Sequence, residues 1–236
     1  MSSPRKVAIV TGASQGMGAG LVDAYRGLGY AVVANSRTLQ PSDDDLVVAV
    51  PGHIGDRTVA QRIVHVALER FGRIDTLVNN AGIFIGKPFT EYTEEDFNAK
   101  IATNVAGFFH ITQRAAAEML KQGSGHIVSI TTSLTDQATS SVPTALANLT
   151  KGGINSATKA LAIEYATKGI RVNAVSPGII KTPMHAPETH EFLANLHPMK
   201  KMGEVRDITD AVLYLENAPF VTGEILHVDG GQSAGH

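Results

Sequence analysis

Cysteine is absent from this chain of 236 residues, and its absence limits the chemistry available to the protein. Without cysteine there is no disulfide framework, no cysteine-ligated zinc or iron–sulfur site and no thiol nucleophile. A chain of this length buries enough surface to fold without such staples. We therefore expect no metal site, and the lack of disulfides leads us to expect a cytoplasmic protein.

A surplus of one charge and long apolar runs are also missing. The 20 basic and 22 acidic side chains give a formal net charge of -2 and are scattered along the chain. Nucleic-acid-binding proteins usually carry a basic surplus or stripe instead. No run approaches the ~20 apolar residues of a membrane span, and the first apolar run stops at Gly12 with no cleavage pattern. We expect no nucleic-acid partner, no membrane span and no secretory signal.

Glycine, in contrast, is abundant, with 23 residues, and short apolar runs alternate with helical periodicity. This alternation favours an α/β fold, a single doubly wound Rossmann-type domain over residues 1–236 with a seven-stranded, mostly parallel sheet. The predicted strands are 7–10, 31–34, 46–50, 74–78, 126–130, 170–175 and 224–228, and the longer predicted helices are 57–71, 93–122, 144–167 and 205–216. Ligands are expected beyond the carboxyl ends of such strands.

A glycine-rich turn follows the first predicted strand. Gly12, Gly16 and Gly18 stand between that strand and a helix, which is the context in which such glycines let the backbone approach a pyrophosphate. The free N–H groups and the dipole of the helix N-terminus favour the same ligand. The turn predicts a dinucleotide site, although tight packing of the strand on the helix would also select glycine.

Several further motifs occur in order along the chain, and together with this turn they resemble the short-chain dehydrogenase/reductase family. The matching segments are Thr11–Gly18, Asn79–Gly82, Asn104, Arg171–Asn173, Pro177–Gly178, Ile180 with Thr182, and Val228–Gly231. The resemblance implies an oxidoreductase that binds a nicotinamide dinucleotide. It also implies a homo-oligomer, a dimer or tetramer packed through the two long helices and the last strand.

The end of the second strand distinguishes NADP(H) from NAD(H). An acidic residue there would hold a ribose 2′-hydroxyl, whereas an arginine accommodates a 2′-phosphate. The strand ends with Ser36 and Arg37, and the first carboxylate is Asp43. We expect NADP(H) to be preferred. His53 and Ile54 follow the third strand, where Ile54 can pack on adenine and His53 can either bond the base or only fill the loop.

The connection between the second and third strands is unusually short. Only nine residues, Thr38 to Leu46, separate Arg37 from the third apolar run, whereas a parallel crossover normally takes a dozen or more residues and often a helix. The sequence therefore predicts a shortened crossover with no helix, which leaves the adenine side of the groove more open. The cofactor contacts predicted from the turn and the resemblance are Gly12, Ser14, Gln15, Gly16, Met17, Gly18, Ser36, Arg37, His53, Ile54, Asn80, Ala81, Gly82, Lys151, Pro177, Gly178, Ile180 and Thr182.

The family's catalytic Tyr-x-x-x-Lys pair is not complete. The family's lysine stands about twenty residues before the arginine that matches Arg171, a count that reaches Lys151 and puts Ala147 at the tyrosine position. Lys159 lies eight residues later, too close to Arg171, and is preceded by Asn155 rather than tyrosine. We assign Lys151 to the site and Lys159 to the helix surface. An alanine cannot donate a proton, so another acid is required for turnover.

Other polar residues are candidates for the remaining catalytic roles. Thr132, with Ser133 next to it, carries the hydroxyl expected to orient a substrate carbonyl, and Asn104 could hold a water near Lys151. His185 and His190 lie in a predicted substrate-covering loop over about 183–202, and histidine titrates near neutral pH.

Two functions from different classes stay open at this stage. The first is a reductase of a carbonyl or activated C=C bond in a small organic substrate, with a proton donor drawn from Lys151, a relayed water or a loop histidine. The second is a sensor or scaffold that binds NADP(H) without turnover. A change of tyrosine to alanine introduced into an active enzyme would produce the same sequence.

Overall fold

One sheet of seven strands runs through the computed structural model, which describes residues 4–235. The strand order is β3-β2-β1-β4-β5-β6-β7, and every neighbouring pair is parallel. The strands are β1 (Val7–Thr11), β2 (Ala31–Ser36), β3 (Val47–Pro51), β4 (Thr76–Asn79), β5 (Gly125–Ile130), β6 (Ile170–Pro177) and β7 (Ile225–Val228). The predicted doubly wound α/β fold is confirmed, and the sheet is entirely parallel rather than mostly so.

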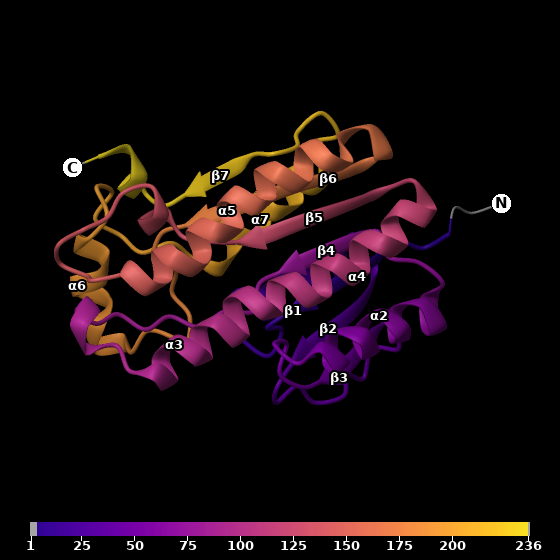
Figure 1. The fold of residues 1–236 in the computed structure, drawn as a ribbon, viewed down its shortest axis with the longest axis horizontal. Coiled ribbons are helices and arrows are strands. Elements are labelled where there is room, and N and C mark those ends of the chain that lie inside the picture. The colour runs from indigo at the N-terminus through magenta and orange to yellow at the C-terminus, as the bar shows by residue number, and fades with distance from the viewer. Residues whose placement is uncertain (1–3, 236) are drawn as a thin grey trace.

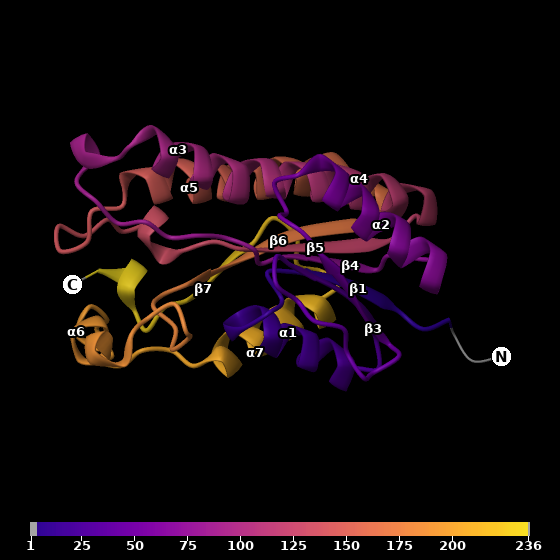
Figure 2. The ribbon, with the colours of Figure 1, turned by 90° about the horizontal axis from the view of Figure 1, so that it is seen from below.

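Helices cover both faces of this sheet (Figure 1 and Figure 2). In Figure 2, α1 (Gly16–Gly27) and α7 (Val205–Asn217) lie below the sheet, and α2 (Arg57–Phe71), α4 (Gly107–Gln122) and α5 (Ala145–Tyr165) lie above it. The shorter α3 (Glu94–Lys100) and α6 (His190–Asn195) lie toward the carboxyl ends of the strands. No helix within residues 4–235 is long and apolar enough to cross a bilayer.

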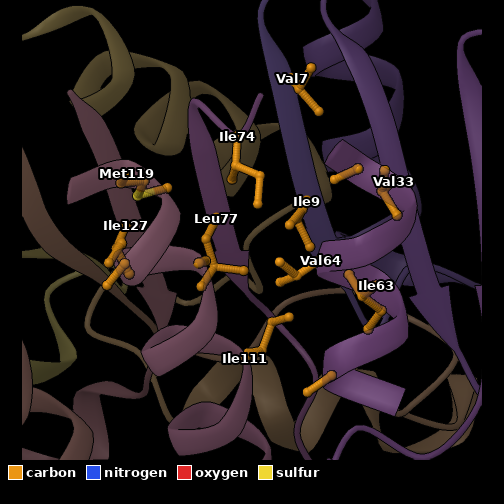
Figure 3. Packing of buried hydrophobic residues seen from close by; sticks show 14 of the residues in the cluster. Val7, Ile9, Val33, Ile63, Val64, Ile74, Leu77, Ile111, Met119 and Ile127 are labelled. Atoms are coloured by element: carbon orange, nitrogen blue, oxygen red, sulfur yellow. The ribbon is translucent and has the colours of Figure 1, made fainter. Parts of the chain in front are cut away.

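The continuous apolar runs of the strands are explained by burial on both faces. Val7 and Ile9 of β1 belong to the core beneath α2 and α4, where Figure 3 shows Ile9 near Leu77 and Val64. Ala8 and Val10 of the same strand belong to the core between the sheet and the helices α1 and α7. Because successive strand side chains point to opposite faces, a strand between two helical layers needs apolar residues at every position.

The order of strands reverses between β1 and β4, since β2 and β3 lie on one side and β5 to β7 on the other. Ligands of doubly wound sheets bind at such a reversal, beyond the carboxyl ends of the strands. The glycine-rich turn after β1 and the segment after β4 both reach this point.

The connection from β2 to β3 contains no helix, as its length predicted. It is held by an exposed ion pair between Arg26 and Asp44, with 2.7 Å between Nε and Oδ2. The strand register is regular despite the short connection, since Asn35 pairs with Val50.

The helix predicted over 93–122 is not continuous. A capping box at Thr93 and Asp96 starts α3, and a π-helical segment, Ile101–Ala106, separates it from α4. Insertions of this kind often occur at functional sites, and Asn104 lies within this one. The expected loop over 183–202 also differs, because it contains the short helix α6.

Candidate functional site

The turn after β1 brings backbone unusually close to backbone. Gly12 and Gly16 adopt left-handed φ angles of 67° and 55°. A Cβ on Gly18 would lie 2.1 Å from the Gly12 carbonyl oxygen, so only glycine fits there. The N-cap residue of α1, Gln15, makes no side-chain cap. The first N–H groups of α1 are therefore available to an anionic ligand such as a pyrophosphate.

Asn80, at the end of β4, ties this turn to the neighbouring strand. Its Nδ2 donates to the carbonyl oxygens of Thr11 and Gly12 at 2.9 and 3.2 Å. Thr11 Oγ1 in turn accepts from the backbone N–H groups of Asn80 and Ala81, each at 3.0 Å. The amide side chain therefore holds the turn in place, a role that the motif alone did not show.

A groove of about 380 Å³ runs from the glycine-rich turn toward the ends of β2 and β3. Most of the predicted cofactor contacts line it. They are Gly12, Ser14, Gln15, Gly16, Met17, Gly18, Ser36, Arg37, His53, Ile54, Asn80, Ala81, Gly82 and Thr182. Arg37 is exposed at the mouth of the groove. The glycine cradle and the lining of the groove fit a nicotinamide dinucleotide.

His53 is one of the groove residues whose role was open. Its Nδ1 accepts from the Gly55 N–H at 3.1 Å, and its Nε2 lies 3.2 Å from Thr103 Oγ1. Because both ring nitrogens already have protein partners, His53 shapes the loop, while Ile54 presents an apolar surface to the groove.

A second cavity of about 320 Å³ adjoins the groove. The two share lining residues, including Met17, Gly82 and Thr182. The predicted residues in the wall of this cavity are Thr132, Ala147, Lys151, Pro177, Gly178, Ile180, Thr182 and His185. Pro177, Gly178 and Ile180, predicted as cofactor contacts, thus lie on this cavity rather than in the groove. Apolar side chains such as Phe84, Leu193 and Leu196 make up much of the rest.

Lys151 extends from α5 to the end of β5. Its Nζ donates to the Ile130 carbonyl oxygen at 2.6 Å and would lie 3.1 Å from a Cβ on Gly82. Burial, together with the charge of Lys100, lowers the pKa of Lys151 to about 8. The buried Ala147 lines the same cavity one turn earlier on α5. Position 147 therefore presents only a methyl group to the cavity that Lys151 lines.

Asn104 holds the segment after β4 beside Lys151. Its Oδ1 accepts from the Ile83 N–H at 3.0 Å, and its Nδ2 donates to the Ile83 carbonyl oxygen at 3.2 Å. A small cavity of about 10 Å³ is lined by both Asn104 and Lys151, a volume that holds about one water molecule. The structure therefore brings Asn104 and Lys151 together, as the sequence predicted.

The two candidate hydroxyls after β5 face different surroundings. Thr132 lines the cavity, and its Oγ1 accepts weakly from the Leu134 N–H at 3.4 Å. The fully buried Ser133 donates to Oε1 of Gln232 at 2.6 Å and does not line the cavity. Thr132 is thus the hydroxyl available to a ligand, and Ser133 anchors the segment near the C-terminus.

The histidines after β6 also differ in their positions and contacts. His185 lines the cavity, and burial lowers its pKa. The Nε2 of His190 lies 3.1 Å from the backbone carbonyl oxygen of His185, so this ring supports the loop. A third histidine, His197, accepts from the Ile179 N–H at 2.9 Å and pins the covering segment to the end of β6.

Lys100 is a charged residue near the site that the sequence interpretation overlooked. It is fully buried, and its Nζ has no hydrogen-bond partner among residues 4–235. A lysine late in a helix that begins with acidic residues is usually solvated, so the composition of this helix did not indicate that Lys100 is buried. A signal was present in the spacing, because Lys100 lies four residues before Asn104 and therefore on the same helical face.

These features define a dinucleotide-binding α/β protein with an adjoining substrate cavity, and comparisons with known proteins agree. A family model described as Enoyl-(Acyl carrier protein) reductase matches residues 12–233. A dehydrogenase subunit of Thauera aromatica that acts on (2S)-[(R)-hydroxy(phenyl)methyl]succinyl-CoA is 34% identical over 99% of this chain and 98% of its own length. A 3-oxoacyl-[acyl-carrier-protein] reductase of Thermotoga maritima is 32% identical over 96% of this chain and 97% of its own.

Solved structures give the same result. ElxO with NADP bound superposes with a TM-score of 0.91 at 30% identity, covering 98% of this chain and all of that one. A 3-ketoacyl-(acyl-carrier-protein) reductase of Brucella melitensis complexed with NADH superposes with a TM-score of 0.89 at 31% identity over the same shares. The chain belongs to the short-chain dehydrogenase/reductase family, a family of oxidoreductases that use a nicotinamide cofactor.

No group of three or more metal-ligating side chains occurs in the part of the chain that the structure describes. Three of the predicted polar side chains, Lys151, Thr132 and His185, line the second cavity.

Proposed function

We propose that the protein is an NADP(H)-dependent reductase of a carbonyl or activated C=C bond in a small organic substrate, with Lys151 as the proton donor. The observation that carries this proposal is that Lys151 and Ala147 share the wall of one cavity, which adjoins the nucleotide groove. In this proposal the ammonium group of Lys151 takes over the role of the hydroxyl of the family's tyrosine.

The chain's own groups suffice for the acid chemistry. When bound, the reduced nicotinamide supplies the hydride. Thr132 Oγ1 donates to the substrate oxygen and orients it. Lys151 holds a proton at Nζ and transfers it to that oxygen as negative charge develops there. A general acid works best when its pKa lies near the working pH, and a pKa of about 8 meets that condition.

After the transfer, Lys151 must recover a proton. The small cavity that it shares with Asn104 has room for about one water molecule. We propose that a water held there by Asn104 passes the proton to Lys151. The apolar walls of the main cavity favour a substrate that is apolar apart from its reacting end.

The test is to measure NADPH binding by fluorescence and then NADPH oxidation on panels of carbonyl and enone substrates, alongside Ala147→Tyr. We expect turnover by the unmodified chain on at least one panel member. Tight binding with no turnover, and activity gained only in Ala147→Tyr, would instead support a sensor or a protein inactivated at position 147. Failure to bind either NADPH or NADH would contradict the proposal entirely.

The preference for NADP(H) rests on Arg37, which is exposed beside Ser36 at the end of β2. Arg37→Asp should weaken NADPH binding relative to NADH, because the carboxylate repels a 2′-phosphate and can accept from a 2′-hydroxyl. Arg57→Asp, at an exposed arginine outside the groove, is the matched control. An unchanged ratio of the two dissociation constants in Arg37→Asp would remove Arg37 from the site.

We further propose that the chain is a single cytoplasmic domain that forms a dimer or tetramer through α4 and α5. Both helices lie on the same face of the sheet (Figure 2), and they expose Phe109, Leu149 and Ile163 by 54, 62 and 80%. Exposed apolar patches of this kind are typical of interfaces between chains. Phe109→Glu with Leu149→Glu should lower the mass measured by light scattering to that of one chain, and an unchanged mass would contradict this interface.

A further inference from the structure

The buried ammonium group of Lys100 is the feature of the site that the proposed function does not use. Lys100 ends α3 and is 0% exposed, and its Nζ has no hydrogen-bond partner within residues 4–235. The ring of Phe84 lies near this group, with 5.2 Å from Nζ to the ring centroid. Burial of an unpaired charge is costly, and an aromatic face offsets only part of that cost.

Three successive residues after β4 connect this lysine to the catalytic group. Gly82 lies against Lys151, since a Cβ there would be 3.1 Å from Nζ. Ile83 is held by Asn104 through both its N–H and its carbonyl oxygen. Phe84 presents its ring to Lys100 and also lines the substrate cavity. Lys151 and Lys100 thus both lie beside the same short backbone segment, residues 82–84.

We propose that Lys100 is a positioning residue that keeps Lys151 acidic, by placing a second, uncompensated positive charge behind the wall of the substrate cavity. The inference rests on the proposed function, in which Lys151 is the proton donor. Like charges disfavour each other's protonated forms, and the effect is strong where water is excluded. Lys100 thereby supplies part of the acidity that an ordinary lysine lacks.

The surroundings of Lys100 contain few other charges. On the loop after β4, Lys87 is already paired with Asp96 of α3, at 2.6 Å between Nζ and Oδ2. On α5, which packs against α3, the facing charged group is Lys151. Burial alone lowers the pKa of Lys100 to about 8, with no contribution from Asp96. Among the described residues, the charge of Lys100 therefore acts on Lys151 in addition to the burial of that amine.

The test is a direct titration of Lys151, which does not require turnover. In protein labelled with 13C-lysine, the Cε resonance of Lys151 is assigned by its loss in Lys151→Arg and followed from pH 6 to 11 by NMR. In Lys100→Met, a neutral side chain of similar length, we expect the Lys151 midpoint to rise by roughly 0.5–1 pH unit. Lys100→Gln is a second neutral variant, and Lys100→Arg, which retains the charge, should keep the midpoint low.

Lys87→Met is the matched control, because it removes a neighbouring lysine that is ion-paired and 37% exposed. The Lys151 midpoint should not move in that variant. An unchanged midpoint in folded Lys100→Met and Lys100→Gln would overturn the inference. If the midpoint rises in both but the unmodified chain turns over no substrate, then the coupling stands and only the proposed function fails.

Discussion

At the amino ends of the strands, the carboxylate of Glu216 is buried with four hydrogen-bond partners, whereas at the carboxyl ends the ammonium group of Lys100 is buried with none among residues 4–235. Glu216 accepts from Tyr25, Tyr30, Thr76 and His126 at 2.9 to 3.1 Å. Buried charges stabilise a fold only when they are fully partnered. The difference indicates that the amino ends are built for stability and the carboxyl ends for chemistry.

The pKa values of the two regions follow the same division. Burial by itself would raise the pKa of Glu216, but the interactions with His126 and the hydrogen bonds from Tyr30 and Thr76 hold it at about 2. Burial lowers the pKa of His126, whose Nδ1 lies 2.9 Å from Oε2 of Glu216. At the other end, burial moves the pKa of Lys100 and Lys151 to about 8, which is useful for proton transfer.

The largest expected effect comes from removing the charge that performs the chemistry. Lys151→Met should lower kcat/KM for NADPH oxidation by about 100-fold or more, because positioned acid catalysis is worth 10²–10⁴-fold. The matched control is Lys159→Met, at an exposed lysine on the same helix, and it should keep full activity. Equal activity in the two variants would show that the proton comes from elsewhere.

The next largest effect is expected at the amino ends of the strands, where Glu216 is buried with four hydrogen-bond partners. It should change stability and leave catalytic activity unchanged. Glu216→Gln removes the charged acceptor from the buried cluster and should lower the free energy of unfolding by about 3 kcal/mol, measured by urea denaturation. Glu224→Gln, at an exposed glutamate, should change it by less than about 0.5 kcal/mol. If Glu216→Gln lost activity but not stability, the division between the two ends would be wrong.

Low pH should destabilise the protein through the same residue, Glu216. The pKa of Glu216 is about 2 in the folded chain and near 4.5 when unfolded, so its contribution is fully present above pH 4.5 and is lost as the pH falls toward 2. The loss should amount to about 3 kcal/mol. Urea midpoints measured between pH 6 and 3 should therefore fall more steeply in the unmodified chain than in Glu216→Gln. Parallel curves for the two proteins would contradict the assignment.

The smallest effect has the opposite sign. Lys100→Met removes an unpartnered buried charge and should raise the free energy of unfolding by about 1–2 kcal/mol, seen as a higher thermal midpoint. Lys87→Met, which only breaks a partly exposed ion pair, should change stability by less than about 1 kcal/mol. A destabilised Lys100→Met variant would mean that the ammonium group is satisfied in a way that the described contacts do not show.

Local patterns in the sequence predicted most of the fold. The apolar run 7–10 required burial on both faces, and the nine residues from Thr38 to Leu46 left no room for a helix. The π-helical segment around Asn104 was not predicted, because it depends on contacts with Ile83 that are distant in sequence. The helix α6 was missed for a similar reason, since it is only six residues long and isolated helices of that length are unstable.

The part of the site that could be predicted is the part whose residues are fixed by the spacing of sequence motifs. The spacing predicted Lys151 and Ala147, and the structure places both on one cavity. Strand alignment favoured Thr132 but kept Ser133 as a second candidate, because the burial of Ser133 depends on Gln232, about a hundred residues further along the chain. The spacing also gave Lys100 no role, since the burial of a lysine depends on what packs over it, here Phe84.

The most direct test of the account is the pH dependence of NADPH oxidation by the unmodified chain, on the best substrate of the carbonyl and enone panels. If Lys151 donates the proton, kcat should be constant at lower pH and fall above about pH 8, as its ammonium group is lost. A kcat that stays constant to pH 10, or no turnover at any pH despite tight NADPH binding, would contradict the central claim.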